Sequence, residues 1–197
     1  MSTKKVTEIP TIDVVMVVVE PAEGDSYVLD TASKIAVEPQ TETQDAIKLI
    51  VKGKLKAQKL EQVTITGNQI TLTDNVFTPE LVKILQGGTI KYWQEETHET
   101  EGTTPTAYGI SSYTPPTVGS GEKGEPFQLH AYSAQYDTSG QIVQYERIDY
   151  PNCQGIPIAL SSEDNVFRVS EYTINSAPRS DEAPYSIHYI DALPVIS

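Results

Sequence analysis

Alternating apolar and polar residues predict β-strands along most of the chain, and the clearest alternation lies between residues 47 and 57. Aliphatic side chains hold one parity there, at Ile47, Leu49, Val51, Leu55 and Ala57. Lysines hold the other parity, at Lys48, Lys52, Lys54 and Lys56. Because successive strand residues point to opposite faces, the pattern predicts one strand with an aliphatic face and a lysine face. Gly53 is predicted to mark a bulge or the close approach of another backbone.

A tight hairpin is predicted over residues 63–72. Two runs rich in β-branched residues flank the pair Gly67-Asn68. Glycine and asparagine are the residues that most readily take the positive φ angles of a two-residue hairpin turn.

One short helix is predicted at residues 79–86. Thr78 is a suitable N-cap, Pro79 suits the first helical position, and Gly87 with Gly88 ends the segment. The helix carries an apolar stripe at Leu81, Val82, Ile84 and Leu85. Such a helix typically covers the open end of a β-sandwich or barrel, so we expect it to flank the sheets.

The remaining pattern completes a mainly β prediction: a β-sandwich or partial barrel in a single domain, residues 26–197. Further strands are expected at 26–37 (with a break near Ala32-Ser33), 89–94, 127–137, 141–150, 156–159, 167–175 and 185–190. The segments 127–137 and 141–150 are expected to form a hairpin, and residues 39–45 a polar turn. Residues 1–25 are predicted to be an N-terminal arm with one β-branched stripe, and residues 95–125 a long polar loop.

The charge balance disfavours tight binding to nucleic acid. The chain has 14 Lys and Arg against 27 Asp and Glu, a formal net charge of −13, whereas affinity for nucleic acid comes mostly from cationic contacts to phosphate. Cys153 is the only cysteine, so no intrachain disulfide can form and synthesis in a cytoplasm is favoured. The apolar run at 14–19 is too short to cross a bilayer, and no membrane partner is expected.

No residue constellation predicts an active site. The G-x-G-x-x-G spacing at residues 119–124 follows a proline pair and precedes a predicted strand, so a flexible loop is favoured over a dinucleotide site. The histidines at 98, 130 and 188 have no metal-ligand spacing, although a zinc site assembled in space stays open. Cys153 is predicted to be a small buried hydrophobe, with a nucleophile as the alternative. We therefore expect a non-enzymatic protein without cofactor or metal.

The lysine stripe at Lys48, Lys52, Lys54 and Lys56 supports two interpretations. With Lys59, these residues place five of the fourteen basic side chains within twelve positions of an acidic chain. One interpretation is a solvated strand face whose lysines protect an edge. The other is a subunit-contact surface for an acidic patch on a neighbouring copy, as in a head-to-tail contact.

Residues 63–88 resemble the major tail protein (tail tube) family of tailed phages and prophages of Gram-positive bacteria. The resemblance rests on the predicted hairpin, Thr78-Pro-Glu-Leu81 and the helix that ends in Gly-Gly. It covers residues 46–94 well and 126–194 loosely.

The resemblance implies a structural virion protein that self-assembles. Six copies would form a ring, and rings would stack into the hollow tail tube that conducts the genome during ejection. It also implies tape-measure, tail-tip and terminator proteins as partners, location in the virion tail after synthesis in the bacterial host cytoplasm, and DNA that crosses the lumen without specific binding. An acidic lumen agrees with the net charge of −13. The segments 1–25 and 95–125 are expected to make ring-to-ring contacts.

Two other function classes remain as alternatives. Eleven tyrosines and Trp93 suit a carbohydrate- or receptor-binding β-sandwich of a phage fibre or cell surface. An enzyme of unknown type is disfavoured because no convergent polar constellation is visible in the sequence.

Overall fold

The computed structural model describes residues 10–161, 163–165 and 168–195 and confirms a mainly β fold, 54% strand and 4% helix. The strands of the large sheet are β1 (Thr11–Pro21), β2 (Tyr27–Leu29), β3 (Ala32–Gln44), β6 (Gln62–Asp74), β10 (Phe127–Tyr136), β11 (Ile142–Gly155), β12 (Ser170–Ser176) and β13 (Ser186–Ile190). The smaller sheets contain β4 (Ile47–Val51), β5 (Lys54–Lys59), β7 (Thr89–Trp93), β8 (Glu101–Gly102) and β9 (Ile110–Thr114), and the helix is α1 (Pro79–Gln86).

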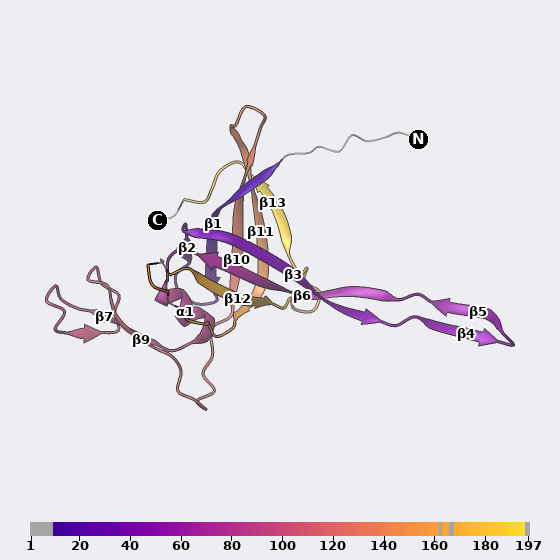
Figure 1. Cartoon of the computed structure of the whole chain (residues 1–197), viewed down its shortest axis with the longest axis horizontal. Helices are drawn as coiled ribbons and strands as arrows, with labels where there is room; N and C mark the ends of the chain where they lie inside the picture. Colours follow the sequence, from indigo (N-terminus) through magenta and orange to yellow (C-terminus); the bar gives the residue numbers. More distant parts are fainter. Residues whose placement is uncertain (1–9, 162, 166–167, 196–197) are drawn as a thin grey trace.

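The large sheet is built from antiparallel pairs in the order β2-β1-β10-β11-β12-β6-β3. β11 shares one edge between two partners: residues 145–149 pair with β13, and residues 153–155 pair with β12. β1 and β3 also contact each other, so the sheet curls on itself without closing into a barrel (Figure 1). The prediction of a sandwich-like mainly β fold is confirmed.

The core lies inside this curl and is covered at one end by α1. Alternate residues of the central strands are buried, including Val17 and Val19 of β1 and Ile70 and Leu72 of β6. This is the alternation expected of strands with one face on a core. Within the described residues, no helix has the length and apolar character needed to cross a bilayer.

The predicted helix is confirmed at Pro79–Gln86. Its four apolar side chains are buried against the sheet, and the Gly87 N–H donates to the Lys83 carbonyl at 2.8 Å. Gly155 of β11 makes this packing possible, because a Cβ at that position would lie 2.5 Å from the Cα of Leu85.

The prediction of an N-terminal arm at 1–25 is wrong for Thr11–Pro21. This segment is β1, which lies between β2 and β10 in the sheet, with Val17 and Val19 fully buried. The physical reason is that the β-branched run is apolar enough to fill the core, which a free arm would leave in water. Residues 1–9 of the predicted arm lie outside the described residues.

The predicted hairpin at 63–72 is also wrong, because β6 runs through it without a turn. Gly67 lies within the strand, where a Cβ would approach the Ser176 carbonyl oxygen of β12 to 2.5 Å. The buried Asn68 donates from Nδ2 to the Pro184 carbonyl at 2.8 Å. Glycine is needed here for the close approach of β6 and β12. The prediction of a polar turn at 39–45 is wrong for residues 39–44, which belong to β3 and pair with β6.

The other strand predictions have mixed outcomes. The hairpin of 127–137 with 141–150, the strand at 89–94 and the strand at 185–190 are confirmed within a few residues, although β11 continues to Gly155. The segment 26–37 contains two strands that break at residues 30–31, slightly earlier than predicted. Residues 156–159 form no strand, part of the long polar loop folds as β8 and β9, and Phe167 of the strand predicted at 167–175 lies outside the described residues.

Candidate functional site

The most distinctive surface is a two-stranded projection, residues 38–66, that extends away from the body of the molecule (Figure 1). Every residue of the projection is exposed. It consists of the outer parts of β3 and β6 followed by the β4–β5 hairpin, and at about 3.3 Å per strand residue it reaches roughly 45 Å. We call residues 46–60, which contain β4 and β5, the tip.

The tip turns at Lys52-Gly53. These residues have φ angles of +48° and +73°, and Val51 pairs with Lys54 across the turn. Positive φ at both central positions is the property of the two-residue turns that fit the twist of a hairpin. The prediction of one continuous strand over 47–57 is therefore wrong, and Gly53 serves the turn rather than a bulge.

The reversal at the turn also divides the predicted lysine stripe. Lys48 pairs with Gln58, whereas Lys54 pairs with Val51, so Lys48 and Lys54 lie on opposite faces of the hairpin. Lys52 lies in the turn, and Lys56 lies at an irregularity of β5. The prediction of a single lysine face is wrong, because odd and even positions before a turn do not predict which face the positions after the turn occupy. The four lysines still gather at one end of the molecule.

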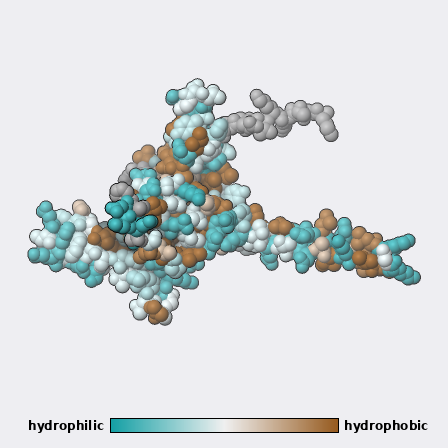
Figure 2. All heavy atoms as spheres, viewed as in Figure 1, coloured by the Kyte–Doolittle hydropathy of each residue, from teal (hydrophilic) through white to brown (hydrophobic). Residues whose placement is uncertain are grey.

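Aliphatic side chains are exposed on both faces of the tip. One face carries Ile47, Leu49 and Val51 and the other carries Ile50 and Leu55, with exposed fractions between 43% and 68%. Figure 2 shows these apolar patches alternating with hydrophilic ones along the projection. An isolated two-stranded hairpin is marginally stable in water, and contiguous exposed apolar surface marks interaction sites. The tip therefore has the character of a surface that a partner covers.

The tip is basic and the rest of the chain is acidic. Between Asp45 and Glu61 there are five lysines and no acidic residue, so the tip carries +5 and the remainder −18 (−13 − 5). Lys59 donates to the Gln44 side chain at 3.2 Å. None of the five lysines forms an ion pair with a residue that the structure describes.

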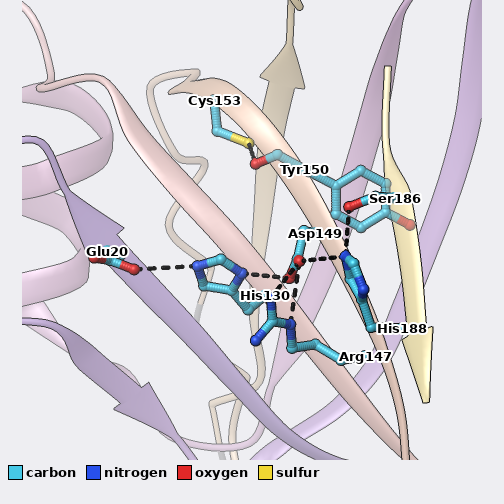
Figure 3. A network of polar contacts seen from close by, with 8 residues as sticks. All are labelled: Glu20, His130, Arg147, Asp149, Tyr150, Cys153, Ser186 and His188. Carbon is cyan, nitrogen blue, oxygen red and sulfur yellow. Dashed lines mark hydrogen bonds and ion pairs between the residues drawn. The ribbon is translucent and has the colours of Figure 1, made fainter. Parts of the chain in front are cut away.

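A polar network joins four strands of the large sheet, with Asp149 of β11 at its centre (Figure 3). The Asp149 Oδ1 contacts His130 Nδ1 at 2.5 Å, and its Oδ2 accepts from Arg147 at 2.7 and 3.1 Å. His188 Nε2 of β13 lies 3.4 Å from the same Oδ2. His130 Nε2 lies 3.2 Å from Glu20 of β1. The network thus ties β1, β10, β11 and β13 together.

The geometry of this network favours a structural role. A Ser-His-Asp relay uses the two different ring nitrogens of its histidine, but His188 Nε2 contacts both Ser186 Oγ, at 3.1 Å, and Asp149. Both nitrogens of His130 contact carboxylates, so this ring links β10 to β1 and to β11. Burial raises the pKa of Asp149, but hydrogen bonds from Arg147 and His130 outweigh burial and hold the pKa below its usual value.

The network also shows what the sequence did not reveal about the histidines. His130 and His188 meet at Asp149, while His98 lies apart and stacks on Trp93 with ring centroids 5.1 Å apart. The pairing of His130 with Asp149 and of His188 with Arg147 across strands brings them together. Within the described part of the chain, no three His, Cys, Asp or Glu side chains are arranged as metal ligands.

Cys153 is fully buried, as predicted, and its thiol donates to the Tyr150 carbonyl at 3.3 Å. Burial raises the pKa of the Cys153 thiol to about 12. Because the thiolate is the reactive form, we expect a thiol reagent at pH 8 to leave the folded protein unmodified and to label one thiol per chain in denaturant. Stoichiometric labelling of the folded protein within minutes would contradict this expectation.

The glycine-rich segment 119–124 and Trp93 are also located by the structure. Residues 119–124 contain neither strand nor helix, as predicted, and Gly124 packs on the C-terminal end of α1 at Ile84 and Leu85. Trp93 is half-buried, and its carbonyl accepts from the Thr106 hydroxyl.

Comparison with protein-family models and with curated proteins finds no match to the chain.

Proposed function

We propose that this chain is a non-enzymatic structural subunit that self-assembles, in rings of six that stack into a hollow phage tail tube. The observation that carries the proposal is the projection, with its exposed aliphatic side chains on both faces of a two-stranded hairpin. A tip covered on both faces suits insertion between neighbouring copies in an ordered assembly. Full burial of a large aliphatic side chain contributes about 1.5–3 kcal/mol, so a few such contacts per copy supply substantial association energy.

The charge distribution supports the same function. With +5 at the tip, the remainder of the chain carries −18. A tube whose inner surface is drawn from such a body repels DNA phosphates and lets the genome pass without specific binding. The ring number and the tube are proposed from the resemblance of residues 63–88 to tail tube proteins. Of its motifs, the helix after Thr78 is present in the structure, whereas residues 63–72 form one strand instead of a hairpin. From the same resemblance we propose the virion tail as the location of the protein and tape-measure, tail-tip and terminator proteins as its partners.

Electron microscopy and light scattering over a concentration series test this function. We expect hollow tubes or rings with six-fold top views, and we expect Leu49→Thr/Leu55→Thr to abolish them, because threonine keeps the strand propensity and removes apolar surface from both faces. Val76→Thr/Val118→Thr is the matched control, since both valines are exposed outside the projection. The control should assemble like the unmodified chain.

A chain that stays monomeric throughout the series, also when tail-tip complexes are added as seeds, would contradict the proposal. Binding to a glycan array by that monomer would instead support a carbohydrate- or receptor-binding module.

A further inference from the structure

The β7–β9 lobe, residues 89–114, presents carboxylates at the opposite end of the molecule from the tip. The lobe carries four glutamates, Glu95, Glu96, Glu99 and Glu101. There is no lysine or arginine between Tyr92 and Glu122. Figure 1 places β7 and β9 at one end of the long axis and β4 and β5 at the other.

Two of these carboxylates already have partners, and two are available. Glu101 forms an ion pair with Lys91 at 3.1 Å and accepts from Ser111, and these contacts lower its pKa, Ser111 most. Glu95 accepts from the Thr100 hydroxyl at 2.5 Å. Glu96 and Glu99 are exposed and form no hydrogen bond or ion pair with a described residue.

The available carboxylates stand on a preformed turn. The His98 N–H donates to the Glu95 carbonyl at 3.1 Å, which closes the turn around Glu96. The His98 ring stacks on Trp93 with an interplanar angle of 23°, and this contact anchors the turn to β7. A charged surface held in place loses less conformational entropy on binding than a flexible one.

We propose that the tip of one copy docks head to tail on the β7–β9 lobe of the next copy, with the tip lysines facing Glu96 and Glu99. Tip and lobe lie at opposite ends of one molecule, so they meet only between copies. A contact between two different patches is heterologous, and heterologous contacts generate rings or stacks. This contact adds a specific interface to the proposed function, and its position within a tube rests on that proposed function.

The aliphatic and charged groups have separate roles in this contact. An exposed ion pair contributes only about 0–1 kcal/mol, so the lysine–glutamate pairs select the orientation and speed the encounter. Tyr108 of the lobe, 46% exposed, offers apolar surface that the aliphatic side chains of the tip can cover.

Charge reversal tests the docking. We expect Lys48→Glu/Lys54→Glu, which alters both tip faces, and Glu96→Lys/Glu99→Lys, which alters the lobe, each to raise the concentration required for assembly at least tenfold. An equimolar mixture of the two variants should sediment faster than either alone, because each reversed surface then meets its complement. Glu23→Lys/Asp25→Lys is the control, since both acids are exposed outside the lobe, and it should shift the assembly concentration less than twofold.

The outcomes separate the two proposals. If the unmodified chain forms tubes, but the reversals leave assembly unchanged or the mixture sediments as its separate components do, the docking is wrong and the tube function stands. If no rings or tubes form under any condition while the mixture still associates, the docking stands and the tube function is wrong.

Discussion

Gly155→Ala is expected to destabilise the protein by about 3 kcal/mol, at the upper end of the cost of overpacking a core. The new Cβ would lie 2.5 Å from both Cα and Cβ of Leu85. The nearest atoms include helix backbone, so a change of side-chain rotamer gives no relief and α1 must move away from the sheet. For a domain of this size, the loss corresponds to a decrease in melting temperature of roughly 6–12 °C.

Gln154→Ala is the matched control, because Gln154 precedes Gly155 on β11 and is exposed. It should change the free energy of unfolding by less than about 0.5 kcal/mol. Urea unfolding followed by circular dichroism, at a concentration where the protein is monomeric, measures both variants. A Gly155→Ala protein as stable as the unmodified chain would show that α1 does not press on β11.

Asp149→Asn is expected to cost about 1.5–3 kcal/mol at pH 7, the range for a hydrogen bond to a charged group. The side chain of Asp149 is 17% exposed and accepts from both His130 and Arg147. The amide keeps the shape of the carboxylate but loses its charge and one acceptor oxygen. The half-buried His130 then lacks a charged partner on β11.

The effect of Asp149→Asn should depend on pH in a defined direction. The pKa of Asp149 in the folded protein lies below the ordinary value of 3.8. Its stabilising contribution is therefore fully present above that value and is lost as pH falls through the lower pKa of the folded state. The difference in unfolding free energy between variant and unmodified protein should narrow below pH 3.8.

Asp30→Asn is the control for this experiment, since Asp30 is exposed and forms no hydrogen bond with a described residue. Its effect should be small at every pH. An Asp149→Asn difference that persists unchanged at low pH would assign the effect to packing rather than to charge.

Elements with local signals were predictable from the sequence. Pro79 at the first helical position and Gly87 at the C-terminal end mark the bounds of α1, although Thr78, the predicted N-cap, makes no side-chain capping hydrogen bond. The turn between β10 and β11 is similar, because Asp137 accepts from the backbone N–H groups of Ser139 and Gln141 within the turn itself.

Elements decided by distant partners were not predictable. Gly67-Asn68 and Lys52-Gly53 both contain a glycine, and local propensity favours a turn at the first pair. The outcome depends instead on Ser176 and Pro184, more than 100 residues later in the sequence, which hold the first pair inside a strand.

The candidate functional surfaces were likewise predictable only in part from the sequence. The clustering of lysines at the tip was visible in the sequence, but their distribution over two faces required the position of the turn. No sequence pattern indicated the network around Asp149. Its members Glu20, His130 and His188 come from separate segments and are brought together only by the register of the strands.

The strand order of the large sheet also determines when the protein can fold during synthesis. Val19 of β1 pairs with Leu129 of β10, 110 positions later, and Asp74 of β6 pairs with Ser170 of β12. The projection closes through the local pairing of β3 with β6 and of β4 with β5. A ribosome-bound chain therefore displays its aliphatic tip long before the body is complete, and such exposed surface is prone to aggregation. The yield of folded protein then depends on how well nascent chains are shielded from one another.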